Sequence, residues 1–504
     1  MFVREKKNKS GKISIQIIDK STGKYKVKKT IGCSHDQEEI ESMKKAAFQW
    51  LKDSNNQMEI DFLNERQMAE SYLESINQIN IIGTDLLLGK IFDEIGFNSL
   101  NEQLFRELVF SRICYPVSKL KTTDYLLKYH SIEIDVDKIY RYLDKLSNQQ
   151  KTRIQEISYN HTLQILNNVI SIIFYDVTTL YFEIDEEDEL RKTGFSKEGR
   201  HQNPQIVLGL LVSVDGYPLA FEIFEGNKFE GYTMLPVIDG FKTMYNLDKL
   251  VVVADSGLLS GDNIHQLQAK GYEYILGARI KGESHVIKQQ ILRLKLANGG
   301  SEIINKDEQT RIIISYSESR AKKDRINREK GLRRLEKQIK TGKLTKSNIN
   351  KRGYNKYLNL DGETKVSINR QALDEDRKWD GLKGYITNTN LTKDEIIANY
   401  GHLWKIEKAF RITKTDLRIR PIFHRLRHRI EAHIIISFAA YKVYKELERL
   451  LKEKHSKLSP EKAIEIAKTI YSIKMTTPLN KEIFEKVIIL NSEQMNLVQI
   501  FDLL

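Results

Sequence analysis

The chain contains little cysteine and little proline for its length. Only Cys33 and Cys114 occur among 504 residues, together with seven prolines and 27 glycines. Two cysteines cannot build a disulfide framework, and Cys33 and Cys114 stand in no metal-ligand spacing, so a structural zinc site is not expected. So few prolines and glycines exclude a collagen-like or low-complexity chain. With 40% apolar and 30% charged residues, the composition is that of a globular protein in a reducing compartment, which predicts the cytoplasm.

Long hydrophobic runs are also absent. The longest apolar stretches, such as residues 434–440, fall far short of the ~20 residues that a membrane-spanning helix needs. The first residues are charged and no apolar segment follows them, so no signal peptide is expected. The sequence therefore predicts a protein with no membrane-embedded part.

Acidic residues are fewer than basic ones, and the excess of basic residues is distributed unevenly along the chain. The chain has 81 Lys and Arg against 68 Asp and Glu, a net charge of +13. Residues 320–356 hold fifteen basic residues against three acidic ones, and residues 405–429 hold nine against two. One such segment can be a solvated helix face, but two segments far apart in the sequence favour a phosphate-binding surface.

The order of the predicted elements indicates a mixed α/β fold. Apolar strands are expected at 169–177, 205–214 and 217–224, the last two forming a hairpin around Asp215-Gly216. Two helix–strand units follow, with helices at 233–245 and 260–269 and strands at 250–255 and 272–278. Three antiparallel strands followed by α/β crossovers are the order of a ribonuclease-H-like core.

Other segments are expected to surround this core. The predicted divisions are a basic β-hairpin and helix at 1–75, a helical DNA-binding region at 76–165, the first part of the core at 166–284, a basic insertion at 285–381, the second part of the core at 382–445 and a C-terminal helical region at 446–504. Within them, helices at 118–129 and 136–146 resemble a helix-turn-helix pair. One long helix is expected from Thr392, where Glu395 completes a capping box, and helix is expected from Phe438 to the end.

Two predicted core strands end in aspartate, Asp176 and Asp255. Either residue alone could be a cap or a turn former. If the strands are parallel neighbours ~4.8 Å apart, however, both carboxylates converge on one edge of the sheet. Their mutual repulsion would then require divalent cations.

The helix after the insertion offers a third carboxylate. Tyr400, Glu407 and Lys414 recur every seven residues and would share one helix face, which could also be an ordinary polar face. The expected buried side of this helix consists of Trp404, Ile406, Ala409 and Phe410.

These residues match a known family pattern. The matching segments are residues 174–182, Gly199-Arg-His-Gln, Val253-Ala-Asp-Ser-Gly, the spaced set Tyr400, Leu403, Glu407 and Lys414, and the segments 315–325 and 382–385. Together they resemble the DDE transposases of bacterial insertion sequences that carry a tyrosine-arginine-glutamate-lysine signature, over roughly residues 85–445. Leu403 stands where the signature has arginine, and Ser260 replaces a usual aromatic residue.

The resemblance implies roles for individual residues. Asp176, Asp255 and Glu407 would bind two Mg²⁺ ions, for which Mn²⁺ could substitute, and Tyr400, Lys414 and Arg411 would contact DNA. Further DNA contacts are expected from the basic insertion, at Lys322, Lys323, Arg325 and Arg333. Trp379 would either stack on a flipped base or pack in the core.

The sequence thus leads to one main hypothesis and two alternatives. The main one is a transposase that binds the ends of an insertion sequence and target DNA, acts as a homodimer, and cleaves and transfers strands. Its N-terminal elements would read the inverted repeats, and its C-terminal helices would pair two protomers. The alternatives are a ribonuclease-H-like nuclease without strand transfer and a DNA-binding protein that keeps the fold but does not cut.

Overall fold

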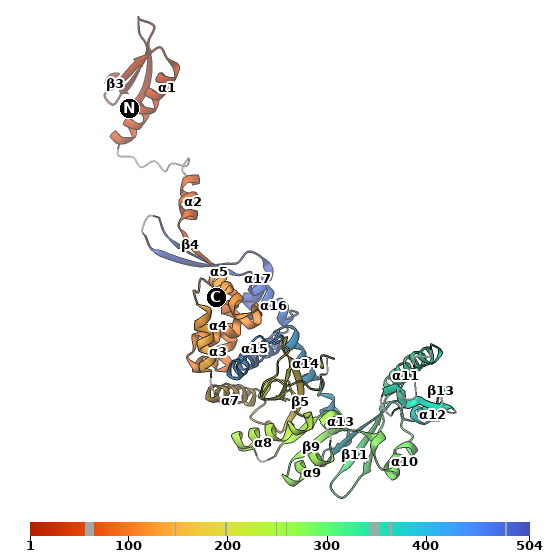
Figure 1. Cartoon of the computed structure of the whole chain (residues 1–504). Helices are drawn as coiled ribbons and strands as arrows, with labels where there is room; N and C mark the ends of the chain where they lie inside the picture. Colours follow the sequence, from red (N-terminus) through yellow and green to blue (C-terminus); the bar gives the residue numbers. More distant parts are fainter. Residues whose placement is uncertain are drawn as a thin grey trace. The chain divides into compact units, whose positions relative to one another are not determined.

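The computed structural model divides the chain into two compact units. One comprises Met1–Asn77 with Lys474–Phe484, and the other Gln78–Ile473 with Glu485–Leu504 (Figure 1). The structure describes residues 1–55, 65–146, 148–196, 199–247, 249–258, 260–341, 344, 350, 353–361, 365–478 and 481–504.

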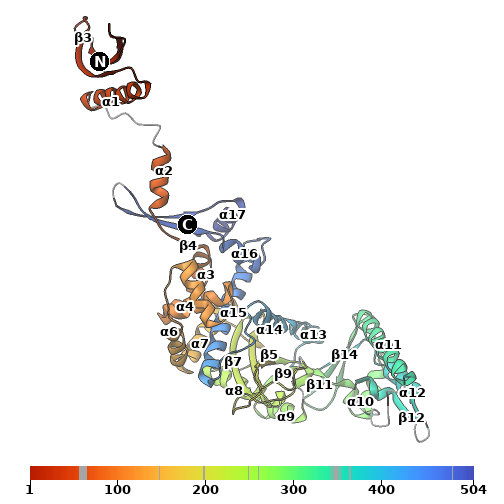
Figure 2. The same cartoon turned by 45° about the horizontal axis from the view of Figure 1, so that its top comes forward.

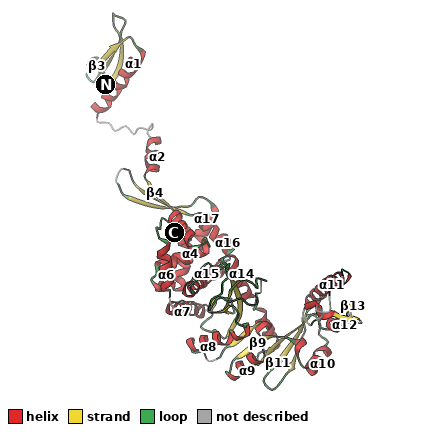
Figure 3. Ribbon diagram, viewed as in Figure 1, coloured by secondary structure: helices red, strands yellow, loops and turns green. Residues whose placement is uncertain are grey.

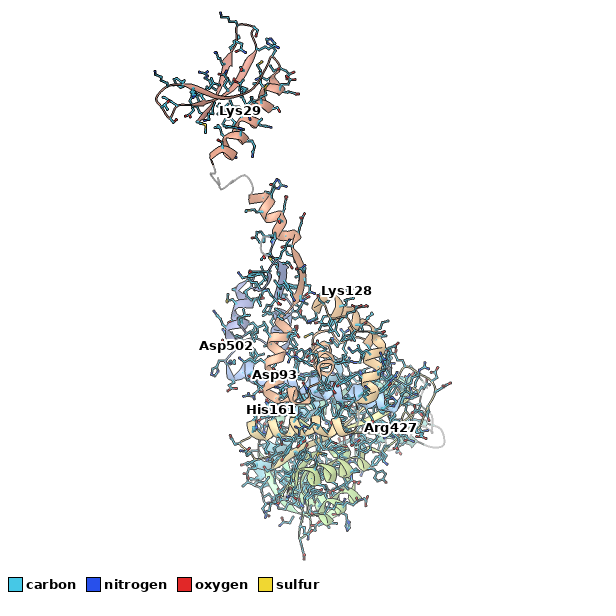
Figure 4. All side chains as sticks on the ribbon, turned by 90° about the vertical axis from the view of Figure 1, so that its left-hand side faces the viewer. Lys29, Asp93, Lys128, His161, Arg427 and Asp502 are labelled. Atoms are coloured by element: carbon cyan, nitrogen blue, oxygen red, sulfur yellow. The ribbon has the colours of Figure 1, made fainter. Side chains whose placement is uncertain are left out.

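The N-terminal segment is a small antiparallel sheet with one helix packed on it (Figure 3). Its elements are β1 (Phe2–Lys7), β2 (Ile13–Asp19), β3 (Lys26–Ser34) and α1 (Gln37–Asn55), followed by α2 (Glu65–Glu74). Ile15, Ile17, Ile40 and Ala47 form its core. Lys29 of β3, labelled in Figure 4, places its Nζ 5.3 Å from the ring centre of Trp50 on α1. The predicted hairpin and helix are confirmed, and β1 adds a strand that the sequence did not predict.

A helical region precedes the main sheet, as predicted. It contains α3 (Gly83–Ile95), α4 (Gln103–Cys114), α5 (Lys119–His130), α6 (Val136–Lys145) and α7 (Asn148–Ile165). The long helix α15 (Arg427–Glu453) packs against α3, α4, α6 and α7. Because α15 is surrounded in this way, residues 430 and 432–444 are all buried, which accounts for the apolar run in the sequence.

An eight-stranded mixed sheet forms the centre of the larger unit. Its strands are β5 (Ile172–Tyr181), β6 (Gln205–Ser213), β7 (Pro218–Glu225), β8 (Val251–Ala254), β9 (Glu273–Ala278), β10 (Ser301–Asn305), β11 (Arg311–Tyr316) and β14 (Leu382–Thr387). They lie in the order β10-β11-β14-β9-β8-β5-β6-β7. Strands β5, β8 and β9 are parallel, and the remaining neighbours pair antiparallel. The part β7-β6-β5-β8-β9 has the ribonuclease-H-like arrangement, which confirms the predicted fold class.

Helices cover both faces of this sheet (Figure 2). The crossover helices α8 (Met234–Tyr245) and α9 (Gly261–Ala269) bury Ile238 and Leu267 against one face. On the other face lie α15, α13 (Lys393–Gly401) and α14 (Trp404–Thr415), which bury Ile396 and Ile406. The predicted Asp215-Gly216 turn joins β6 to β7, and Gly216 there has a φ of +84°, which glycine adopts without steric cost.

The insertion after β9 both extends the sheet and adds a small cluster of its own. In addition to β10 and β11, the insertion contains α10 (His285–Arg293), α11 (Glu318–Lys340), β12 (Leu358–Asp361), β13 (Lys365–Ile368) and α12 (Arg370–Arg377). The cluster consists of Leu335, Tyr357, Leu358, Val366 and Leu373. The core resumes at β14, as predicted around Gly384.

Two helix predictions near the C-terminus are wrong. The capping box of Thr392 and Glu395 is present, but the helix that it starts ends at Gly401, and α14 begins at Trp404. Residues 402 and 403 form tight turns there, directly after Gly401. Glycine favours such a break, because it weakens a helix by ~1 kcal/mol relative to alanine.

The second error concerns the end of the chain, where continuous helix was expected. Between α16 (Pro460–Ala467) and α17 (Ser492–Phe501) lie β15 (Tyr471–Thr476) and β16 (Ile483–Ile488). With β4 (Ile76–Ile81) they form a sheet in the order β16-β15-β4. The β-branched and aromatic residues of these strands favour β structure.

Short 3₁₀ helices complete the structure, at Phe97–Leu100, Glu230–Tyr232, Ser256–Leu258, Ile280–Gly282 and Gly353–Tyr357. Among the described helices, none combines the length and the apolar character that crossing a membrane requires.

Candidate active site

Asp176 and Asp255 lie next to each other on neighbouring parallel strands. The register of β5 and β8 ends at the pair Tyr175 and Ala254, and the next residues are Asp176 and Asp255. Asp255 directly follows β8, as expected, but the expected strand end at Asp176 is wrong, because β5 continues to Tyr181 through its pairing with β6. Side chains alternate along a strand, so Asp176 shares a face with Phe174, and Asp255 follows Val253 on that same face. Phe174 and Val253 pack toward α14 and α15, so both aspartates belong to the face that α14 covers.

Tyr400 of α13 contacts this pair directly. Its hydroxyl donates to Asp255 Oδ1 at 2.9 Å, and its ring meets Tyr385 of β14 edge-on, 4.9 Å between centres. Burial, and then the charge of Asp255, raise the pKa of Tyr400, so the phenol keeps its proton. Tyr400 therefore acts as a hydrogen-bond donor to a carboxylate that the sequence singled out.

Gly277 of β9 makes this contact possible. A Cβ atom at that position would lie 2.5 Å from the Tyr400 hydroxyl and 3.0 Å from the Ser256 nitrogen. Glycine is required here by the close approach of Tyr400.

Lys383 of β14 brings a positive charge to the same place. Its Nζ lies 4.4 Å from the centre of the Tyr400 ring and 5.3 Å from that of Tyr385. Burial lowers the pKa of Lys383, and nearby Arg320 lowers it further, while the charges of Asp255 and Glu407 raise it. Lys383 is thus close enough to interact electrostatically with both predicted acids.

Glu407 projects from the first turn of α14, which packs against β5, and its side chain is exposed. Its charge acts on Tyr400 as well as on Lys383. Across the described part of the chain, however, no three His, Cys, Asp or Glu side chains are grouped closely enough to hold one metal ion. The structure therefore puts Asp176 and Asp255 at adjacent positions of parallel strands, while Glu407 acts on Tyr400 and Lys383 as Asp255 does, and within the described residues no three-ligand set is closed.

The donor chemistry of these residues suits a hard divalent cation. All three side chains offer carboxylate oxygens, the ligands that Mg²⁺ and Mn²⁺ prefer, and none is fully buried. The two aspartates on one sheet edge are the part of the set that fits such an ion.

A cavity of about 580 Å³ opens beside this site, between the main sheet and the insertion. Its lining includes Ser256, Lys383, Arg320 and Trp379. Trp379 lies in the turn before β14, not within a strand, and its partly buried ring also packs on the core. The packing of Trp379 on the core is thus observed, while its stacking on a base stays a prediction.

The predicted basic contacts on the insertion lie on α11. Lys322, Lys323, Arg325 and Arg333 are exposed there. Arg328 of the same helix is buried and donates through both terminal nitrogens to Asp380 at 2.5 Å, so it braces the insertion.

The predicted helix face around Glu407 is only partly correct. Glu407, Arg411 and Lys414 all lie on α14, with Arg411 exposed and Lys414 half-buried. Tyr400 lies on the separate helix α13, so its spacing of seven residues from Glu407 does not place it on the helix face of Glu407. Trp404, expected on the buried side, is 53% exposed because it begins α14 just after the break.

Comparison with known families decides what this domain is. The sequence model described as "Transposase DDE domain" matches residues 168–442, more than half of the chain. This chain belongs to the DDE transposase family. It is therefore an enzyme of the transposase class, and the matched segment includes every candidate carboxylate described above.

Solved transposase structures show only a distant likeness. The piggyBac transposase synaptic complex with hairpin DNA aligns with a TM-score of 0.39 and 10% identity, covering 77% of this chain and 78% of that chain. The Mos1 transposase paired-end complex with left transposon end gives 0.16 and 8%, covering 31% and 53%. No curated protein sequence matches this transposase significantly. Its fold assignment rests on its own strand order.

Three residues at this transposase site were missed from the sequence. They are Lys383, Gly277 and Tyr385. Two signals were available for Lys383 and Tyr385: both lie in the segment 382–385 that carries the family resemblance, and their alternation along a strand puts both on one face.

Proposed function

We propose that this transposase binds the ends of an insertion sequence and, with divalent cations, cleaves DNA and transfers strands into a target. The observation that supports this most is the position of Asp176 and Asp255 directly after Tyr175 and Ala254, the last registered pair of two parallel strands, with Tyr400 donating to Asp255. In this proposal Asp176, Asp255 and Glu407 hold two Mg²⁺ ions. Such ions would supply the charge that activates a water or a 3′-hydroxyl and stabilises the leaving oxygen.

The side chains around the carboxylates have separate tasks in the proposal. Tyr400 fixes the orientation of Asp255 through its hydroxyl. Lys383 balances part of the negative charge, because it interacts with both Asp255 and Glu407. Lys414 and Arg411, on the helix of Glu407, contact phosphates of the bound strand.

DNA would follow the basic side of the insertion. The exposed cations of α11 neutralise its backbone, and Trp379 stacks on a base that enters the cavity of about 580 Å³. The N-terminal elements read the inverted repeats, and two protomers hold the two ends.

The carboxylate assignment is tested with Asp176→Asn. Removing one charge keeps the side-chain shape, so Mg²⁺-dependent cleavage of a cognate end should fall to background while affinity for that end changes little. The measurements are gel-based cleavage and fluorescence anisotropy on one DNA duplex. Full cleavage by this variant would contradict the assignment.

A matched control comes from the acidic loop after β5. Asp185→Asn makes the same chemical change at an exposed residue, so cleavage should stay at the wild-type level. Wild-type protein that cleaves but never joins strands would instead indicate a nuclease. Wild-type protein that binds ends but never cuts, with Mg²⁺ or Mn²⁺, would indicate a DNA-binding role alone.

The DNA path is tested on α11. Replacing Lys322, Lys323, Arg325 and Arg333 by glutamine should lower the slope of log affinity against log salt by ~0.9 for each DNA phosphate that the variant no longer neutralises. Anisotropy titrations at several salt concentrations measure this slope. An unchanged slope would make these residues a solvated helix face.

A further inference from the structure

We propose a second phosphate-binding site, in a basic pocket between α4, α5 and the segment that joins α14 to α15. This pocket, here called the α4–α5 pocket, has a volume of about 380 Å³. Its cationic lining residues include Arg112, Lys119, Lys121, Arg418 and Arg420. It shares no lining residue with the cavity beside the carboxylates.

Two of these cations are buried and have no acidic partner among the residues that the structure describes. Lys119 and Arg112 are each only 6% exposed. Lys119 begins α5, and within the described residues no protein group forms a hydrogen bond or ion pair with its ammonium. Arg112 Nε is also buried, with no hydrogen-bond partner in the described part of the chain. Burying an uncompensated charge costs several kcal/mol, so such a pair is unusual unless a ligand neutralises it.

The other nitrogens of Arg112 are held by neutral groups. Its Nη1 donates to the Arg418 carbonyl at 3.4 Å, and its Nη2 lies 3.5 Å from His433 Nδ1. Burial holds the pKa of His433 well below its usual value, so this imidazole is neutral. Its Nε2–H donates to the Ile419 carbonyl at 2.9 Å, which leaves Nδ1 free to accept from Arg112. The guanidinium is thus positioned without being neutralised.

No carboxylate lines the α4–α5 pocket among the described residues. The nearby Asp144 is already engaged, since Arg429 donates to both of its oxygens at 2.5 and 2.7 Å and His428 lies at 2.8 Å. The N-terminus of α5, capped by Ser118, adds its partial positive charge at Lys119. The pocket is therefore built to receive an anion.

The arrangement of these cationic side chains points to a phosphate ligand. The charges of a guanidinium and an ammonium, with further cations at the rim, suit the several oxygens of a phosphate group. Cationic side chains also extend from the pocket to the end of β5 in the transposase core. Arg420 at the pocket lies 5.7 Å from the ring of Tyr181, the last residue of β5, and Arg200 covers that ring at 4.2 Å. The phosphate could belong to the DNA backbone or to a free phosphate compound, and the experiment separates the two.

The experiment compares three substitutions on one helix. Lys119→Met removes the buried ammonium, Lys121→Met removes an exposed pocket cation, and Lys128→Met is the matched control. Lys128, labelled in Figure 4, is an exposed residue of α5 that does not line the pocket. Melting temperatures are measured in chloride and in inorganic phosphate at equal ionic strength.

Phosphate should raise the Tm of wild-type protein and of Lys128→Met alike, increasingly with concentration. The increase should be lost in Lys119→Met and reduced in Lys121→Met. General exclusion of phosphate from protein surfaces affects all variants equally and cancels in the comparison. In chloride, Lys119→Met should melt no lower than wild type, because it removes a buried charge. An equal phosphate response in Lys119→Met and Lys128→Met would overturn the proposal.

DNA binding distinguishes the source of the phosphate. If Lys119→Met lowers the salt slope for duplex DNA by ~0.9, the group is a backbone phosphodiester. If the slope is unchanged while the thermal response is lost, the ligand is a free phosphate compound. Neither readout requires cleavage, so both remain measurable if the carboxylate assignment fails.

Discussion

At the residue scale, the candidate site depends on contacts around Asp255. Tyr400, Lys383 and Gly277 come from three different elements, α13, β14 and β9. The tyrosine reaches Asp255 only because residue 277 has no side chain. The site should therefore be sensitive to a single methyl group at that position.

Gly277→Ala should slow DNA cleavage by ~10- to 100-fold, the cost of losing a hydrogen bond to a charged group. The new Cβ would collide mainly with the Tyr400 hydroxyl, 2.5 Å away, and would also press on the Ser256 nitrogen, 3.0 Å away. Tyr400→Phe should have a similar effect, and end binding should persist in both variants. Single-turnover cleavage rates measure the change.

Gly240→Ala is the control for this substitution. Gly240 is a glycine of α8 with open space where a Cβ would be, so alanine should stabilise the protein by ~0.5–1 kcal/mol and leave cleavage unchanged. A Gly277→Ala protein that cleaves at the wild-type rate would show that the Tyr400 contact is dispensable.

At the element scale, α14 is attached to α15 by a buried ion cluster. Glu448 of α15 accepts from Lys408 of α14 and from Lys445 of α15. Burial by itself would raise the pKa of Glu448, but these two lysines lower it from 4.5 to about 2. This cluster helps to hold the helix that carries Glu407 in place.

Glu448→Gln should lower the free energy of unfolding at pH 7 by ~2–4 kcal/mol. The carboxylate is more acidic in the folded protein than in the unfolded one. Its stabilisation is therefore present above pH 4.5 and is lost as the pH falls toward 2. Denaturant unfolding of both proteins at pH 7 and pH 3 should show the difference shrinking. Glu453→Gln, at an exposed ion pair on the same helix, should change stability by less than ~1 kcal/mol.

The element scale is also where prediction from sequence succeeded and failed. The strands and helices between 169 and 278 were predicted within a few residues, because each has a clear period and turn residues at its ends. The break between α13 and α14 and the hairpin of β15 and β16 were missed. Both lie in segments whose apolar pattern also fits a helix, and the local signals against it, Gly401 and the β-branched residues of the two strands, are too weak to change the prediction.

At the scale of the whole molecule, the chain contains several separate hydrophobic cores. The core of residues 1–55, around Ile15, Ile17 and Ile40, shares no residue with the two large clusters of the main sheet. Its buried apolar residues pack against one another within this segment. Stability of the transposase core should therefore not depend on it.

Removing residues 1–55 should leave the main unfolding transition at the same temperature, measured by differential scanning calorimetry. The same truncation should weaken binding to cognate ends if the N-terminal elements read the inverted repeats. A clear drop in the main transition temperature would mean that this segment stabilises the core.

The sequence by itself determined the order of the core elements and the identity of the acidic candidates. Both depend on local patterns, namely periodic apolar residues and the aspartates that follow two apolar runs. Only the tertiary structure decided that Gly277 admits Tyr400, that Lys383 lies over the Tyr400 ring within reach of the charges of Asp255 and Glu407, and that Arg112 and Lys119 are buried with no acidic partner in the described part of the chain. These features depend on which distant segments become neighbours. Close approach and the desolvation of a charge are properties of that assembly, and no local pattern encodes them.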